Sequence, residues 1–155
     1  MVDNSNFITP EGLKEFEREL EERLEIRKEI AQSIKSAKEQ GDLSENAEYS
    51  EAKSKQGENE RRMNWLKCVI KKAQVVEKQG RNNVELGCLV ELAKKGSTAS
   101  DLSFQIVGTH ETNPAKGKIS CESPLGKALM GKKKGNEVEF ETPNGKEKYK
   151  IKEIK

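Results

Sequence analysis

The chain of 155 residues has few aromatic residues and no long apolar run. It holds one Trp, two Tyr and four Phe, while charged residues make up 36% of it. This composition leaves little material for one large core and favours long solvated helices. No apolar run is long enough to cross a membrane, and no signal-peptide pattern opens the chain. We therefore expect a soluble, cytoplasmic protein with no membrane partner.

Cysteine and histidine are also scarce. Cys68, Cys88 and Cys121 are odd in number and widely spaced, and the single histidine, His110, is far from them in the sequence. The pattern favours small buried side chains in a reducing compartment over disulfides or a metal cluster. The net charge of +2 is close to zero, so bulk attraction to nucleic acid or to a membrane is not indicated.

Two long helices are predicted in the first half of the chain, after a frayed segment over residues 1–8. Thr9 followed by Pro10 and an acidic residue is typical of a helix start. Apolar residues then recur in steps of three and four, as in a coiled-coil seam, and Arg23 and Arg27 interrupt that seam in its middle. The apolar positions are Leu13, Phe16, Leu20, Leu24, Ile30, Ile34 and Ala37.

Gly41 is expected to end the first helix, and a second is predicted over about residues 45–76. The first part of this helix has few apolar residues at core-type positions, two of which are taken by Gln56 and Asn59. Apolar residues become more frequent toward the end of the helix. A short connection between long helices requires antiparallel pairing, which would bring Phe16 and Leu20 near Leu66 and Ile70.

Residues 80–83 are predicted to be a linker. After them, the spacing between apolar residues changes from steps of three and four to steps of two. Short runs in which apolar and polar residues alternate indicate antiparallel strands around residues 88–92, 104–106, 138–140 and 149–151. Thr142-Pro143-Asn144-Gly145 predicts the hairpin turn between the last two strands. Ser123-Pro124 predicts the start of one short helix, which Gly131 can close.

Residues 41–51 contain acidic residues at a spacing that is unfavourable on a helix. Asp42, Glu45, Glu48 and Glu51 recur every three residues with no basic residue among them, so their charges would repel on a helix. In one interpretation Asp42 caps the second helix and Glu45 completes a capping box, which leaves the other two unexplained. In the other, Asp42 and Glu45 complete a Mg²⁺ site whose remaining ligands come from a partner. Spacing alone favours the capping interpretation.

Two lysines and a tyrosine lie close to this acidic stretch. Lys38 and Lys53 could face a nucleic-acid backbone beside the carboxylates, or could pair with neighbouring glutamates, which is the favoured reading from the residues alone. Tyr49 could stack on a base or pack across the end of the hairpin.

At these motifs the chain resembles the GreA/GreB family of bacterial transcript cleavage factors, over nearly its whole length. The resemblance rests on residues 41–49, G-D-L-S-E-N-A-E-Y, with Ala52-Lys53, and on residues 123–129, S-P-L-G-K-A-L, with Gly131-Lys132 and the turn at 142–145. It implies an α+β fold. An N-terminal antiparallel α-helical coiled-coil hairpin over residues 1–79, with its tip at about 40–46, would precede a C-terminal FKBP-like antiparallel β domain with one short helix over residues 80–155.

The resemblance implies an accessory factor and not an enzyme in its own right. The C-terminal domain would dock on bacterial RNA polymerase while the hairpin enters the secondary channel. Asp42 and Glu45 would help to hold Mg²⁺ shared with a backtracked polymerase, which then cleaves its own RNA 3′ end. Lys38 and Lys53 would contact that RNA 3′ end, although Lys stands where the family often has Arg and binds phosphate less well. We expect no cofactor bound stably by the chain alone, and a monomer.

Two alternatives belong to other functional classes. One is an inhibitor that plugs the channel with the same architecture and no productive acid pair; the intact spacing of Asp42 and Glu45 argues against it. The other is a stand-alone FKBP-like binding module or chaperone, which would not require an acidic tip.

Overall fold

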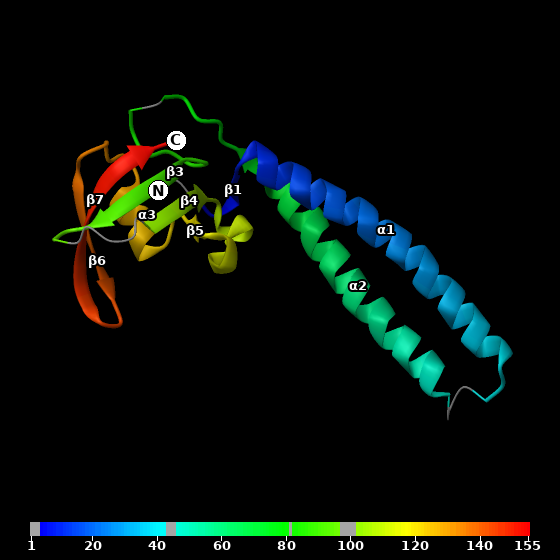
Figure 1. Cartoon of the computed structure of the whole chain (residues 1–155). Coiled ribbons are helices and arrows are strands. Elements are labelled where there is room, and N and C mark those ends of the chain that lie inside the picture. Colours follow the sequence, from blue (N-terminus) through cyan, green and yellow to red (C-terminus); the bar gives the residue numbers. More distant parts are fainter. Residues whose placement is uncertain (1–3, 43–45, 81, 97–101) are drawn as a thin grey trace. The chain divides into compact units, whose positions relative to one another are not determined.

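The computed structural model describes residues 4–42, 46–80, 82–96 and 102–155 (Figure 1). The chain divides into two compact units. One is Leu13–Lys72, and the other joins Met1–Gly12 to Ala73–Lys155. This division differs from a boundary after residue 79, because segments on both sides of the helical unit pack with the second half of the chain.

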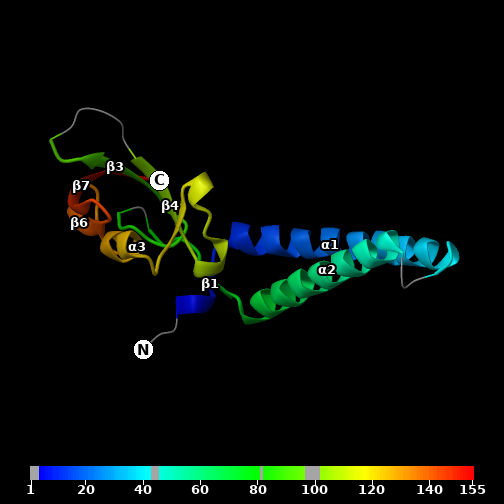
Figure 2. The same ribbon diagram turned by 90° about the horizontal axis from the view of Figure 1, so that it is seen from below.

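The unit Leu13–Lys72 is a hairpin of two long helices. Helix α1 spans Pro10–Glu39 and helix α2 spans Ala47–Lys72, and they run side by side in opposite directions (Figures 1 and 2). The predicted antiparallel pairing is confirmed, since Phe16 of α1 packs edge-on against Trp65 of α2 with ring centroids 5.6 Å apart. No helix in the described part of the chain is long and apolar enough to span a membrane.

The seam between the helices is apolar near both ends and polar in its middle. Met63 and Leu66 are fully buried, and the small Ala37 and Ala52 are nearly so close to the turn. Asn59, 3% exposed, takes the core-type place that the sequence predicted. The predicted seam is wrong at Leu24, which is 39% exposed, because the arginine beside it makes the contact with the opposite helix.

Two ion pairs join the helices near this polar segment. Arg62 of α2 donates two hydrogen bonds of 2.7 Å to Glu19 of α1 and lies 4.3 Å from the centroid of the Trp65 ring. Arg27 contacts Glu60 at 2.6 Å. The hydrogen bond from the Arg62 guanidinium lowers the pKa of the Glu19 carboxyl, because it favours the charged form.

We predict that this pair makes the stability of the hairpin sensitive to acid. With a depressed folded pKa, Glu19 stabilises the hairpin above the ordinary glutamate value of 4.5, and this contribution is lost as the pH falls through the lower folded value. Glu19→Gln should reduce the free energy of unfolding near neutral pH by about 1 kcal/mol, since the pair is only partly exposed. In urea titrations the difference from wild type should shrink as the pH falls through the lowered pKa of Glu19. A difference that stays constant with pH would contradict this.

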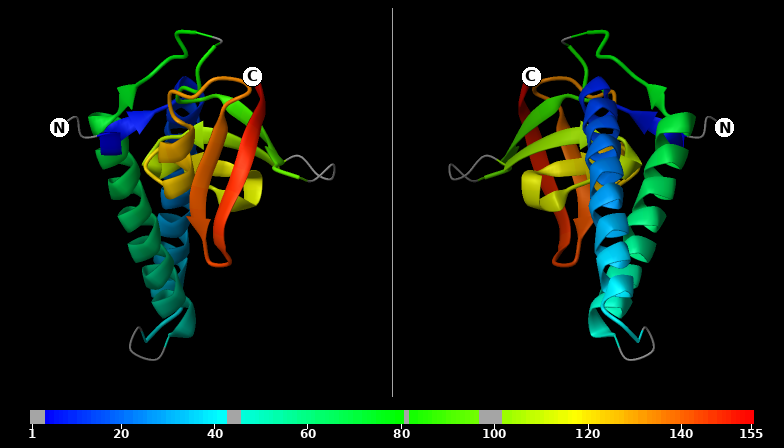
Figure 3. Two further views of the ribbon diagram at one scale, coloured as in Figure 1. Left: turned by 90° about the vertical axis from the view of Figure 1, so that its left-hand side faces the viewer. Right: turned by 90° about the vertical axis from the view of Figure 1, so that its right-hand side faces the viewer.

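The other unit is built on a five-stranded sheet with the order β5-β4-β3-β7-β6 (Figure 3). Neighbouring strands are antiparallel except β4 and β5, which run parallel, so the sheet is mixed where only antiparallel strands were expected. A parallel pair needs a crossover connection, and this one contains two short 3₁₀ helices, η2 and η3. The elements are β3 Leu89–Lys94, β4 Leu102–Val107, η2 Thr109–Glu111, η3 Pro114–Lys116, β5 Lys118–Ser120, β6 Glu137–Thr142 and β7 Gly145–Ile154.

One apolar core lies under this sheet and helix α3, Pro124–Leu129. The predicted short helix is confirmed: the hydroxyl of Ser123 accepts a hydrogen bond of 3.0 Å from the Gly126 N–H, as an N-cap does. Gly131 follows with φ 76°, a conformation that suits glycine. The largest fully buried side chains of the core are Leu92, Ile106, Leu129, Ile151, Val84, Val90 and Cys88.

Residues 4–8 are ordered in this unit and are not frayed as predicted, while residues 1–3 of that prediction lie outside the described residues. The 3₁₀ helix η1, Asn4–Asn6, leads into strand β1, Phe7–Ile8, which pairs in parallel with β2, Gln74–Val75. The Val76 N–H donates to the carbonyl of Ile8 at 3.0 Å. These strand hydrogen bonds also explain why α2 ends at Lys72 and does not continue to about residue 76.

A buried carboxylate ties Thr9 to the distant 3₁₀ helix η2. Glu111, 9% exposed, accepts hydrogen bonds from the Thr9 N–H at 2.8 Å, from the Thr9 hydroxyl and from the Gly108 N–H at 3.1 Å. The Thr9 oxygen accepts in turn from the Gly12 N–H at 3.0 Å, so Thr9 is the N-cap of α1 as predicted. Because an added Cβ on Gly12 would lie 1.8 Å from Glu111 Oε1, glycine is required there.

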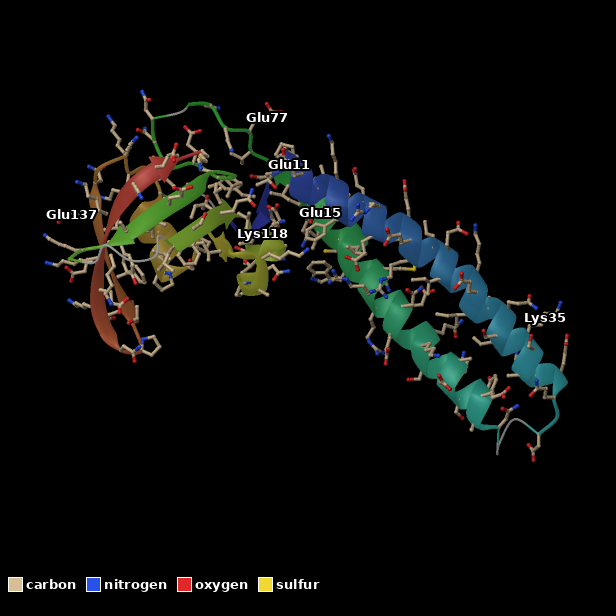
Figure 4. The ribbon with its side chains drawn as sticks, in the orientation of Figure 1. Glu11, Glu15, Lys35, Glu77, Lys118 and Glu137 are labelled. Carbon is tan, nitrogen blue, oxygen red and sulfur yellow. The ribbon has the colours of Figure 1, made fainter. Side chains whose placement is uncertain are left out.

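We predict that Glu111→Gln destabilises the protein, because one of two acceptor oxygens becomes an NH₂ group, facing either the Thr9 hydroxyl that Oε1 accepts from or the two N–H groups that Oε2 accepts from. The free energy of unfolding should fall by about 1–3 kcal/mol in denaturant titrations. Glu77→Gln makes the same chemical change at an exposed position of the same unit (Figure 4) and should stay within about 0.5 kcal/mol of wild type. Equal stability of the two variants would show that the buried hydrogen bonds contribute nothing.

Candidate functional site

The turn of the helical hairpin is closed by the side chain of Asn46. Its Oδ1 accepts a hydrogen bond of 3.0 Å from the Tyr49 N–H and so caps α2, while its Nδ2 donates to the carbonyl of Ala37 at 2.9 Å. Helices leave N–H groups at their start and carbonyls at their end without partners inside the helix. Asn46 satisfies one of each, and therefore joins the beginning of α2 to the last turn of α1.

This geometry shows that the capping interpretation of Asp42 is wrong. Helix α2 begins at Ala47, and the cap is Asn46. Asn and Asp cap helices about equally well, so spacing could not choose between them. Asp42 is exposed and follows Gly41, which ends α1 as predicted with φ 122°. Glu45, the second candidate acid, lies outside the described residues.

The local chemistry of α2 accounts for the last two acids of the series. Glu48 lies in the first turn of α2, where a negative charge interacts favourably with the helix dipole. Glu51 pairs with Lys55 at 2.6 Å, and the hydrogen bond from this lysine lowers the pKa of the Glu51 carboxyl. The four-carboxylate series is therefore divided: Glu48 and Glu51 belong to α2, whereas Asp42 precedes it.

The basic and aromatic candidates lie on the helix turns next to this loop. Lys38 is exposed in the last turn of α1. Lys53 is exposed on α2, and its Nζ donates to Gln56 at 2.8 Å. Tyr49 is half-buried in the first turn of α2. The sequence interpretation missed Lys35, which is exposed three residues before Lys38 and so on the same face of α1 (Figure 4).

An exposed carboxylate in this turn is the type of ligand that Mg²⁺ takes. Asp42 offers one, but nowhere in the described ranges do three or more His, Cys, Asp or Glu side chains gather to hold a metal. A site with one or two protein carboxylates needs further ligands from another molecule.

The chain therefore combines a helical hairpin, with the exposed Asp42 in its turn, and a mixed-sheet unit. Comparison with protein families shows which class of proteins has this sequence. Residues 6–75 match the family "Transcription elongation factor, N-terminal", and residues 78–155 match "Transcription elongation factor, GreA/GreB, C-term". The chain belongs to the GreA/GreB family of transcription elongation factors.

Individual relatives agree with this family over the full length of the chain. It is 44% identical to transcription elongation factor GreA of Lachnoclostridium phytofermentans, with 99% of this chain and 98% of the relative covered. It is 42% identical to the GreA protein of Thermosipho africanus, with 100% and 99% covered. Among solved structures, GreA factor homolog 1 (Gfh1) of Thermus thermophilus is 28% identical, with a TM-score of 0.45 over 96% of this chain and 97% of that one.

We predict that Asn46 stabilises the turn through both of its hydrogen bonds. Asn46→Ala removes both, whereas Asn46→Ser keeps a capping oxygen, lacks the amide donor and adds no charge. The free energy of unfolding should fall by about 1 kcal/mol in the alanine variant and by less in the serine variant. Hydrogen exchange at the first turn of α2 should accelerate in the same order. Asn64→Ala, at an exposed position of α2, is the matched control. Equal free energies of unfolding and equal hydrogen-exchange rates in the two alanine variants would refute this role of Asn46.

Proposed function

We propose that this chain rescues backtracked bacterial RNA polymerase by inserting its hairpin into the secondary channel and stimulating cleavage of the RNA 3′ end. Family membership supports a role on RNA polymerase, and relatives above 40% identity are named elongation factors. The observation that carries the proposal is the exposed carboxylate of Asp42 in a turn whose capping is done by Asn46.

In this proposal Asp42 and Glu45 supply carboxylate oxygens to a Mg²⁺ ion that the polymerase also ligates, and they orient a water molecule. When bound, Mg²⁺ stabilises charge on the phosphate and lowers the pKa of water for phosphodiester hydrolysis. The chain itself contributes geometry and charge, and the bond is cleaved in the polymerase. Because the described part of the tip gathers no closed set of ligands, we expect no stable metal binding by the factor alone.

Lys38 and Lys53 are assigned to the RNA backbone, one on each side of the turn. Both side chains are exposed, and Lys35 extends the basic face of α1 by one turn. Phosphate contacts of this kind position a strand without reading its sequence. Tyr49 is assigned a stacking contact with an RNA base through the exposed part of its ring.

Docking on the polymerase is assigned to residues 80–155 and stimulation of cleavage to the hairpin within residues 1–79. The factor acts as a monomer, since a single hairpin would occupy a single channel. An inhibitor of the same architecture would share the docking contacts, so the cleavage reaction, and not binding, distinguishes the two functions.

We predict that Asp42→Asn lowers the maximal rate of stimulated RNA cleavage by about 10- to 100-fold, because it removes a charged ligand from a shared metal site. Polymerase affinity should change by less than about twofold, since docking is assigned elsewhere. Cleavage gels on a stalled, backtracked complex at saturating factor measure the rate. Glu48→Gln is the matched control, because it neutralises another exposed acid of the tip that the structure assigns to α2.

Undiminished cleavage by the Asp42→Asn variant would refute the assigned role. A second arm omits the polymerase: the purified factor with RNA and Mg²⁺ should cleave nothing. Cleavage in that arm, lost again in the Asp42→Asn variant, would make the chain a nuclease in its own right.

A further inference from the structure

The polar middle of the hairpin seam contains one buried amide that bonds to the opposite helix twice. Asn59 of α2 is 3% exposed. Its Nδ2 donates to the backbone carbonyl of Arg23 at 3.1 Å, and its Oδ1 accepts from Arg23 Nη1 at 3.4 Å. Nδ2 also lies 3.5 Å from the sulfur of Met63. The amide is therefore satisfied in a seam where the nearest buried apolar residues of α2 are Ala52 and Met63.

These contacts extend into a seam cluster of four residues, Glu19, Arg23, Asn59 and Arg62. Glu19 accepts from Arg23 Nε at 3.4 Å on its own helix and from Arg62 across the seam at 2.7 Å. The seam cluster thus crosses between the helices at two places, and each crossing requires particular residues of α1 and α2 to lie opposite one another.

Near the turn, the apolar part of the seam specifies that alignment weakly. Ala37 and Ala52, the buried side chains near the turn, are small, and Leu24 does not enter the seam. Coiled-coil seams of repeating apolar residues can pair in more than one register, and a single buried Asn is an effective device for selecting one. In any other register the Asn59 amide would be buried without its partners, which a folded protein avoids.

A change of register would move the functional turn. Each residue of helix rises 1.5 Å, so a shift of seven residues displaces one helix along the other by about 10 Å. Asp42 lies just beyond the end of α1 and would move with it. Displacements far smaller than this are enough to disrupt catalysis.

We propose that Asn59 is a positioning residue that fixes the register of α1 against α2, and through it the place of Asp42 at the end of the hairpin. The proposal rests on the function assigned above. Asn59 acts through the hairpin and touches no reacting atom. Its loss should consequently lower the maximal rate of stimulated cleavage, while affinity for polymerase and thermal stability are kept.

The register can be measured in the isolated protein by the distance between two spin labels. Cys68 is naturally exposed on α2, and Ala31→Cys adds an exposed label site on α1, while Cys88 and Cys121 are buried. The two label sites are far apart along the helices, so the distance between them reports a slip. Asn59→Leu should broaden or shift a distribution that is narrow in wild type. Asn64→Leu, the same change at an exposed position of α2, should leave it unchanged.

The consequence for function is tested by stimulated cleavage at saturating factor. Asn59→Leu should reduce the maximal rate by about tenfold or more, with the half-saturating concentration within about twofold of wild type. Its melting temperature should not fall, because replacing a buried polar contact with an apolar side chain of similar volume is often neutral or stabilising. Asn59→Ser, too short to reach the Arg23 carbonyl, is the second variant if the leucine variant fails to fold. The same changes in spin-label distance and cleavage rate are expected of it, with a lower melting temperature, because its hydroxyl is buried without those partners.

A cross-link provides the rescue that distinguishes positioning from a purely structural role. Arg27 and Glu60 contact one another at 2.6 Å across the seam, so cysteines at both positions, in a Cys68→Ser background, can be joined by a short cross-linker. This link fixes the register without Asn59 and should restore cleavage to the Asn59→Leu variant.

An unchanged spin-label distance in both Asn59 variants, or a wild-type cleavage rate despite a shifted distance, would overturn the proposal. So would a cross-linked variant whose cleavage stays as low as before linking. Because the distance measurement needs no polymerase, the register is still tested if Asp42→Asn cleaves normally and the proposed function fails.

Discussion

The two helices of the hairpin meet along a seam, and their alignment depends on polar groups that are satisfied across it. Asn46 supplies this constraint at the turn, where its amide caps α2 and reaches the carbonyl of Ala37. Asn59 supplies it in the middle, with two hydrogen bonds to Arg23. Apolar burial supplies much of the attraction, but it is not directional. The directional bonds therefore determine how the two helices are aligned.

The acidic turn is understood best from what its neighbours do. Because Asn46 caps α2 and Lys55 neutralises Glu51, the helix makes no demand on Asp42 as a cap. An exposed carboxylate in this turn is the type of ligand that a metal ion bound by another molecule can take. In the proposed function the polymerase supplies the catalytic centre, so the factor does not need a catalytic cleft of its own.

Much of the fold could be predicted because its signals are local. The cap at Thr9, the turn at Gly41 and the cap at Ser123 follow from residue type and spacing, and all three are seen. The sequence could not choose the cap of α2, since Asp42 and Asn46 are equally good candidates and only the path of the chain decides.

Other features depended on distant partners and left no local signal. Strand β1 exists because residues 74–75 lie beside it, and Leu24 is exposed because Arg23 makes the cross-helix contact. The parallel pair β4 and β5 is likewise set by the crossover that joins them. For the site, the types and positions of the candidate residues could be read from the sequence, whereas the division of the four acids required the geometry of α2.

The bond between Glu111 and Thr9 has a consequence for the order in which the protein forms during synthesis. Thr9 leaves the ribosome early, yet its partner is made about a hundred residues later. The helical hairpin, by contrast, is contiguous and has all its residues once Lys72 has emerged. The hairpin can therefore fold first on the nascent chain. The residues that precede it can pack only after their partners in the second half of the chain have been synthesised.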